Sequence, residues 1–186
     1  MVGRSERVFD ELLVLRCQDG ETNAFEELVG RWQRKLLRHA LHLTGDADGA
    51  NDVVQESWFA IVRGIGRVDD PARFPSWAYR IVTHKAADWI RKRQRRRAVE
   101  DALEDALEPP RPIVPQDSAN DELDALRAAL RNLPRDARVV LSLHYLEGLG
   151  VRDMARALGI PAGTVKSRLF NARNKLKQVL ERKEVS

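Results

Sequence analysis

Residues 151–165 read VRDMARALGIPAGTV, a spacing that predicts two helices joined by a tight turn. Ala155 is small enough to let two helices approach closely, and Gly159 can take the left-handed conformation that such a turn requires. Pro161 suits the start of the following helix, where its missing N–H costs nothing. Val165 then returns to the apolar core. The stretch is typical of a helix-turn-helix, whose second helix enters the major groove of DNA.

The helix after this turn, expected from about Ala162 to Glu181, separates its side chains by chemistry. At about 100° per residue, apolar residues fall in one narrow sector and hydrogen-bonding residues fall in the opposite one. The first sector holds Val165, Leu169, Ala172 and Leu176, and the second holds Lys166, Ser167, Phe170, Asn171 and Asn174. Arg168 and Arg173 lie on the flanks, where the phosphates of a duplex would be. The sorting favours DNA binding over a solvated helix face, but it does not separate one class of DNA-binding protein from another.

Helical periodicity continues along most of the chain, and strand signals are nearly absent. Besides a short leading segment over residues 8–17, we expect helices over 23–43, 48–63, 75–97, 121–132, 136–147, 151–158 and 162–181. Gly45 should end the first of these in a left-handed cap, and Asp48 should cap the next.

A sharp change in composition separates the two helical halves. Residues 98–120 contain Glu100, Asp101, Glu104, Asp105, Glu108 and Asp117, several prolines and a single basic residue, Arg111. Proline and like charge at this density oppose a packed helix, so we predict a flexible acidic linker. The predicted architecture is all-α, with a first domain over 1–97, the linker over 98–120 and a helix-turn-helix domain over 121–186.

Bulk composition limits the classes of protein that remain. The chain has 186 residues, of which 43% are hydrophobic, so two small domains can bury real cores. Cys17 is the only cysteine, which excludes a disulfide framework and argues against a cysteine-based zinc site. The N-terminus lacks an apolar signal core, and no apolar run approaches the roughly 20 residues that span a bilayer. We therefore expect a cytoplasmic protein.

The segment from Trp77 to Arg97 combines aromatic and basic residues on one helix. By helical angle, Arg80, His84, Arg91 and Arg95 share a face, and Ala78, Val82, Ala86 and Trp89 share the other. The first face suits the backbone of a nucleic-acid strand. The run of basic residues over 91–97 is most simply a phosphate contact, with a solvated run as the alternative. We expect Trp58, Trp77 and Trp89 in the core rather than stacked on bases.

Four phrases together resemble the extracytoplasmic-function (ECF) sigma factors of bacterial RNA polymerase. They are FEELVGRW, DVVQESW, SWAYRIVTHKAADWIRKRQRR and LPRDARVVLSLHYLEGLGVRDMARALGIPAGTVKSRLFNARNKL, and the resemblance covers nearly all of the chain. It implies a protein that binds core RNA polymerase and directs it to promoter DNA. No cofactor, metal or catalytic group is implied, and an anti-sigma factor is a possible further partner.

The resemblance also implies residue roles. The residues implied to bind core polymerase are Asp52, Gln55 and Glu56. Those implied to contact the minus-10 element are Arg80, His84, Arg91 and Arg95. Those implied to contact the minus-35 element are Lys166, Ser167, Arg168, Phe170, Asn171 and Arg173. The loop over 63–75 would hold a flipped base. His84 stands where asparagine is common in the family, so its contact with DNA stays open. The acidic linker would thread toward the RNA exit path, or would serve only as a solubilising tether.

Two other classes of function compete with this interpretation. A helix-turn-helix regulator with an N-terminal sensing domain would explain residues 151–181 but not DVVQESW. A nucleic-acid hydrolase could use Asp52 and Glu56, which lie four apart on one helix face. Neither a Glu-x-x-His partner nor a P-loop accompanies these carboxylates, and a solvated acidic face is the simpler alternative to a metal site.

Overall fold

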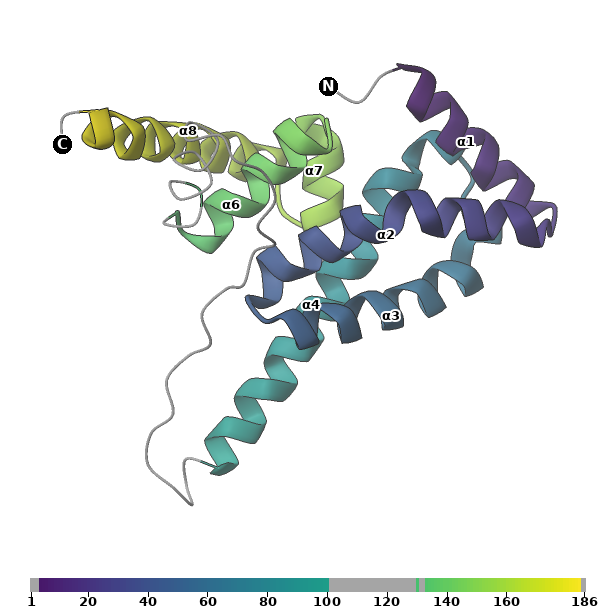
Figure 1. The fold of residues 1–186 in the computed structure, drawn as a ribbon, viewed down its shortest axis with the longest axis horizontal. Helices are drawn as coiled ribbons and strands as arrows, with labels where there is room; N and C mark the ends of the chain where they lie inside the picture. Colours follow the sequence, from purple (N-terminus) through teal and green to yellow (C-terminus); the bar gives the residue numbers. More distant parts are fainter. Residues whose placement is uncertain (1–3, 101–129, 131–132, 185–186) are drawn as a thin grey trace. The chain divides into compact units, whose positions relative to one another are not determined.

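The computed structural model describes residues 4–100, 130 and 133–184. Within these residues the chain is helical, with turns between the helices and no strand (Figure 1). The chain divides into two compact units, Val2–Ile113 and Val114–Ser186. The all-α class with two helical units is therefore confirmed. The domain boundaries at 97 and 120 stay a prediction, because residues 101–120 and most of the expected helix 121–132 lie outside the described residues.

Over its described residues, 4–100, the N-terminal unit consists of four helices and two short 3-10 turns. These are α1 (Arg4–Gln18), α2 (Thr22–Thr44), α3 (Ala47–Gly64), η1 (Ile65–Arg67), η2 (Pro71–Arg73) and α4 (Phe74–Glu100). Helices α2, α3 and α4 pack against one another, and α1 packs against α2 and both turns. The C-terminal end of α4 extends past the other helices of this unit (Figure 1). Because α4 runs to Glu100, the first three residues of the predicted linker are helical.

The core of this unit is built from the inward faces of α1, α2, α3 and α4. Trp32 lies at its centre, with its ring edge-on to Phe74 at a centroid distance of 5.1 Å and tilted against Tyr79 at 5.7 Å. The three tryptophans expected in the core, Trp58, Trp77 and Trp89, are each half-buried and so lie at its edge. All four tryptophans of the sequence belong to the N-terminal unit.

The connection between α2 and α3 uses a glycine as predicted but a different cap. Gly45 has φ 70° and donates its N–H to the carbonyl oxygen of Leu41, which ends α2. The N-cap of α3 is Asp46, whose Oδ1 accepts a hydrogen bond of 2.8 Å from the Gly49 N–H. The prediction that Asp48 caps this helix is wrong, because α3 starts directly after Asp46. Asp48 lies instead in the first turn, where its carboxylate faces the positive end of the helix dipole.

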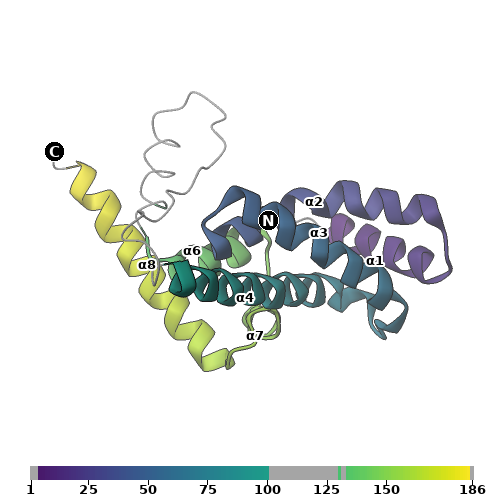
Figure 2. The same cartoon turned by 90° about the horizontal axis from the view of Figure 1, so that it is seen from below.

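The C-terminal unit contains α6 (Arg135–Leu141), the π-helical turn η3 (Ser142–Leu146), α7 (Val151–Leu158) and α8 (Ala162–Glu184). Helices α6 and α7 pack against α8, whose C-terminal part extends beyond them (Figure 2). The single helix predicted over 136–147 is thus α6 followed by a π turn, in which the Glu147 N–H bonds the Ser142 carbonyl oxygen at 3.2 Å. The core of the unit includes Val140, Leu143 and Met154, all fully buried.

Candidate nucleic-acid and polymerase interfaces

The turn between α7 and α8 has the predicted helix-turn-helix geometry. Gly159 adopts φ 66° and donates its N–H to the Ala155 carbonyl oxygen, which closes α7. The Pro161 carbonyl oxygen accepts the first hydrogen bond of α8, from the Val165 N–H at 3.1 Å. Val165 itself is fully buried. The second helix is therefore fixed to the core at its first turn.

Helix α8 presents two chemically different sides. Val165, Leu169 and Ala172 are buried and Leu176 is half-buried, whereas Lys166, Ser167, Phe170, Asn171 and Asn174 are exposed. The sorting by helical angle is thus confirmed. Phe170 is 63% exposed, although its ring is large and apolar. An exposed ring among hydrogen-bonding side chains suits a surface that reads bases, because a thymine methyl group offers it an apolar contact.

Both flanking arginines of α8 have partners on the preceding segment of the unit. Arg168 forms an ion pair of 3.0 Å with Asp136 of α6. The Arg173 Nε donates a hydrogen bond of 2.8 Å to the Tyr145 hydroxyl, and its guanidinium lies 5.6 Å from the Tyr145 ring centroid. Both contacts are exposed to solvent, where ion pairs contribute little to stability. The arginines are therefore oriented by neighbours that a phosphate could replace.

The predicted basic face of α4 is exposed as a whole. Arg80, His84, Arg91 and Arg95 are all exposed, and Ala78, Val82 and Ala86 on the other side are buried. Arg91 forms an ion pair with Asp88, which lies on the same face of the helix. Asp88 was not among the residues predicted on this face, although its i,i+3 spacing to Arg91 is visible in the sequence. It lowers the positive charge of the face at its centre.

The acidic face of α3 is also exposed, and it is partly apolar. Asp52, Gln55 and Glu56 lie on it, and the Glu56 carboxylate accepts a hydrogen bond of 3.0 Å from Lys85 of α4. The same helix exposes Phe59 to 59% and Val62 to 50%. Neither side chain was predicted to be part of this surface. Their spacing of four and seven residues after Gln55 was the available signal, because it places all three on one helix face.

The loop between α3 and α4 is held by a residue of α1. The Gln18 side-chain amide donates hydrogen bonds of 3.0 Å to the Ile65 carbonyl oxygen and 2.8 Å to the Val68 carbonyl oxygen. Asp70 then caps η2 by accepting a hydrogen bond of 3.1 Å from the Ala72 N–H. Nothing in the sequence near Gln18 indicates this contact, because its partners follow 47 and 50 residues later.

Neither a metal-binding cluster nor a membrane-spanning helix is found in the part of the chain that the structure describes. It has no group of three or more His, Cys, Asp or Glu residues that could hold a metal ion. No described helix is long and apolar enough to cross a bilayer.

Comparison with known proteins identifies both units. The family model for Sigma-70 region 2 matches residues 28–96, and the model for Sigma-70 region 4 matches residues 123–176. The ECF RNA polymerase sigma-E factor of Haemophilus influenzae is 33% identical, with 95% of this chain and 98% of that protein covered. The chain belongs to the ECF RNA polymerase sigma factors. This sigma factor is also 33% identical to the RNA polymerase sigma-H factor of Pseudomonas aeruginosa, over 92% of this chain and 94% of that protein.

Two solved structures share the fold of this sigma factor. RpoE from Bartonella quintana, solved in complex with the anti-sigma factor NepR, aligns with a TM-score of 0.68 and 26% identity. The alignment covers 84% of this sigma factor and 96% of that chain. CnrH, solved with the cytosolic domain of CnrY, aligns with a TM-score of 0.62 and 26% identity over 93% of this chain and 97% of that one.

As a sigma factor, the protein binds core RNA polymerase and promoter DNA and directs promoter-specific transcription initiation. The region 2 match lies in the N-terminal unit, where a conventional regulator would carry a sensing domain. The regulator alternative is therefore not favoured.

Proposed function

We propose that this sigma factor reads the minus-35 element with α8, engages the minus-10 element with α4 and binds core polymerase with the exposed face of α3. The observation that carries the proposal is the division of α8 into a buried apolar side and an exposed side with Lys166, Phe170 and Asn171. Lys166 and Asn171 can donate hydrogen bonds to base edges in a major groove. Arg168 and Arg173, on the flanks, are suited to phosphates.

The test compares these two groups of α8 residues. Lys166→Ala or Asn171→Ala should cost about 1–3 kcal/mol on the preferred promoter and relax the preference at one base position. Arg173→Ala should weaken binding to all promoters alike and lower the salt dependence by about one unit of slope. The measurement is holoenzyme affinity for a set of minus-35 variants at several salt concentrations. If Lys166→Ala leaves the ranking of variants unchanged while Arg173→Ala alters it, the proposed orientation of α8 is wrong.

For core polymerase we propose a surface on α3 formed by Asp52, Gln55, Glu56, Phe59 and Val62. Carboxylates beside exposed apolar side chains are typical of a protein interface, since the apolar groups gain from burial and the charges set the orientation. Because Glu56 already has Lys85 as a partner, Asp52 should contribute more.

Charge reversal tests this surface. Asp52→Lys should weaken binding to core polymerase more than Glu56→Lys, and Glu26→Lys, at an exposed position of α2, is the matched control. A titration of labelled core polymerase measures the affinities, and circular dichroism checks that helicity is retained. Equal affinity of Asp52→Lys and the control would remove α3 from the interface.

For the minus-10 element we propose that Arg80, His84, Arg91 and Arg95 follow the strand backbone and that the loop over 63–75 receives a flipped base. The hydrogen bonds of Gln18 to this loop support its role in receiving the flipped base, because a loop that binds a base has to be held in one conformation. We also propose that the protein acts in the cytoplasm and supplies no catalytic group, since phosphodiester chemistry belongs to the polymerase.

An anti-sigma factor is a further proposed partner, because RpoE of Bartonella quintana was solved with one. The proposed role of the acidic linker concerns residues outside the described part of the chain.

Transcription in vitro with purified core polymerase tests the function as a whole. Promoter-dependent transcripts should require this protein, and a footprint on duplex DNA without core polymerase would contradict it.

A further inference from the structure

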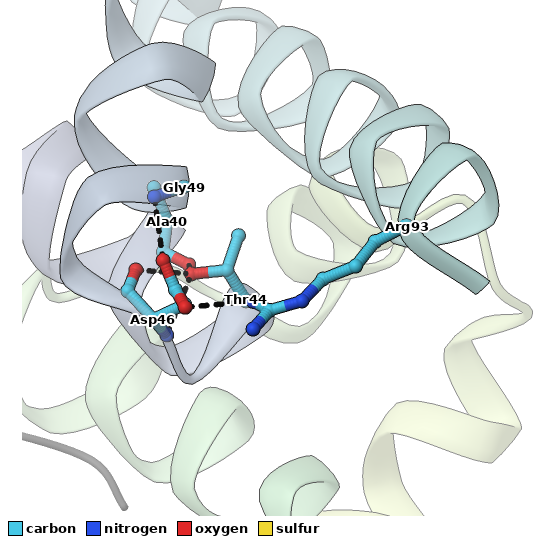
Figure 3. A network of polar contacts seen from close by, with 5 residues as sticks. All are labelled: Ala40, Thr44, Asp46, Gly49 and Arg93. Atoms are coloured by element: carbon cyan, nitrogen blue, oxygen red, sulfur yellow. Dashed lines mark hydrogen bonds and ion pairs between the residues drawn. The ribbon is translucent and has the colours of Figure 1, made fainter. Parts of the chain in front are cut away.

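The basic residues at the end of α4 look equivalent in the sequence but differ in the structure. Arg91, Lys92, Arg95 and Arg96 are exposed, whereas Arg93 is half-buried, with its side chain 30% exposed. Its guanidinium does not extend from the basic face. It reaches across to the connection between α2 and α3 (Figure 3).

Arg93 meets a carboxylate that already has a structural role. The Arg93 Nη1 donates a hydrogen bond of 2.7 Å to Oδ2 of Asp46, while Oδ1 of the same carboxylate caps α3 through the Gly49 N–H. The Thr44 hydroxyl bonds the Asp46 carbonyl oxygen at 3.0 Å and so fixes the backbone of the cap (Figure 3). The Asp46 side chain is only 18% exposed, so water screens this ion pair less than one on the surface.

A second contact lies beside the first. The Arg93 guanidinium covers the Trp89 ring at 4.9 Å from its centroid. The same indole also lies against Gly49, where an added Cβ would fall 2.2 Å from Trp89 Cζ2. Two successive turns of α4 therefore pack against the N-terminal end of α3. We name Asp46, Gly49, Trp89 and Arg93 the α3–α4 joint.

We propose that Arg93 is a positioning residue, which sets the direction of the C-terminal half of α4 through the α3–α4 joint, and not a phosphate contact. To reach a phosphate, Arg93 would have to give up both Asp46 and the Trp89 ring. The joint connects the helix that is proposed to bind polymerase with the helix that is proposed to bind the minus-10 element. The joint would determine where the exposed arginines of α4 lie when α3 is bound to polymerase. The proposal therefore rests on the functions proposed above for α3 and α4.

Substitution of Asp46 by asparagine distinguishes a phosphate contact from a positioning role of Arg93, because the first predicts a gain for the promoter complex and the second predicts a loss. Asparagine caps a helix about as well as aspartate does, so Asp46→Asn keeps the cap and removes the charge that faces Arg93. If Arg93 bound phosphate, loss of the nearby carboxylate would strengthen DNA binding. If Arg93 positions α4, the same change should slow promoter opening.

The experiment uses holoenzyme with Asp46→Asn, Arg93→Gln, the double variant and Arg95→Gln as the phosphate-contact comparison. Arg95→Gln should lower the slope of log affinity against log salt by about one unit. Arg93→Gln and Asp46→Asn should keep that slope and should each slow open-complex formation about tenfold, with the double variant no slower than either single one. Affinity for core polymerase checks that each variant is folded.

When Arg95→Gln behaves as expected, any of three results would overturn the proposal. A fall in salt slope for Arg93→Gln equal to that of Arg95→Gln would make Arg93 a phosphate contact. Faster opening with Asp46→Asn would do the same. Lower resistance to urea with unchanged opening would reduce the joint to a structural role. If Arg95→Gln has no effect on slope or opening, the proposed DNA role of α4 fails. The joint is then judged by non-additivity of Asp46→Asn and Arg93→Gln in urea unfolding, and additive effects would reject it.

Discussion

In the N-terminal unit, partly buried polar side chains connect helices that are far apart in the sequence, whereas the long-range polar contacts described in the C-terminal unit are exposed. Gln18 bonds the loop after α3, His39 bonds Thr83 of α4 at 3.0 Å, and Arg93 bonds Asp46. In the C-terminal unit, Arg173 meets Tyr145 at the surface. The first unit thus fixes its helices with specific polar pairs as well as an apolar core.

This difference indicates how each unit should respond to substitution. A hydrogen bond away from water is stronger, and its loss leaves a partner without hydration. An exposed pair loses little, because water replaces the missing group. Helix α8 packs on α6 and α7, and its buried side carries Val165 and Leu169, so substitution of its exposed residues should cost little stability. The N-terminal unit should be the more sensitive one.

The largest effect is expected at Gly49 of α3, which lies against the Trp89 ring of α4. Gly49→Ala would place a Cβ 2.2 Å from the Trp89 ring and should lower the free energy of unfolding by about 3 kcal/mol. Gly30→Ala on α2 is the control, since nothing lies within 4 Å of the added Cβ, and it should stabilise the unit by about 0.5 kcal/mol. Tryptophan fluorescence in urea reports the N-terminal unit alone. Equal midpoints for both variants would contradict the close packing.

A smaller effect should appear on acidification, through His39. Burial, with a lesser contribution from the charge of His42, lowers the pKa of His39 to about 3, against about 6.5 in an unfolded chain. Below about pH 6.5 the unfolded state therefore binds a proton that the folded state does not. Between pH 7 and pH 5 the N-terminal unit should lose about 2 kcal/mol more than His39→Gln does. Urea titrations at both pH values measure this difference, and parallel curves for the two proteins would exclude it.

Loss of the Gln18 hydrogen bonds should have a local effect of intermediate size. Gln18→Ala removes both donors to the loop carbonyls and should destabilise the unit by about 1 kcal/mol. Amide hydrogen exchange over residues 65–73 should become faster, while exchange in α2 stays the same. Gln94→Ala, at an exposed position of α4, is the control and should change stability by less than about 0.5 kcal/mol. Unchanged exchange in the loop would show that α1 does not hold it.

The smallest effect is expected for the Asp136–Arg168 pair of the C-terminal unit. The two side chains are 61% and 38% exposed, so a double-mutant cycle with Asp136→Asn and Arg168→Gln should give a coupling below about 0.5 kcal/mol. Calorimetric unfolding of the full chain provides the values. A coupling above about 1 kcal/mol would remove the contrast between the two units.

The features predictable from sequence are those whose determinants lie within one helix or one turn. The two sides of α8 follow from the 3.6-residue period, and the left-handed turns at Gly45 and Gly159 follow from glycine itself. The period also placed Arg80 and Arg95 on the exposed side of α4. In each case the sequence contains both the residue and its structural reason.

The remaining features depend on partners from another helix. The helical angle predicts the side of α4 on which Arg93 lies. It does not predict that Asp46, in the connection between α2 and α3, is its partner. The same applies to Glu56, which was predicted to bind core polymerase and is paired with Lys85 in the structure. The π turn after α6 was missed because its residues have ordinary helical preferences. The roles of the DNA-contacting and polymerase-binding residues stay predictions.

The π turn at Ser142–Leu146 has a consequence for chain length. A π turn uses one residue more than an α turn, so it absorbs a one-residue insertion while the flanking residues keep their faces. We expect a chain with one residue deleted here to retain the packing of Leu141 and Leu149. The exposed Tyr145 would then be carried away from Arg173. A relative with a single-residue gap at this turn should therefore keep the packing on both sides of it and differ in the surroundings of Arg173 on α8.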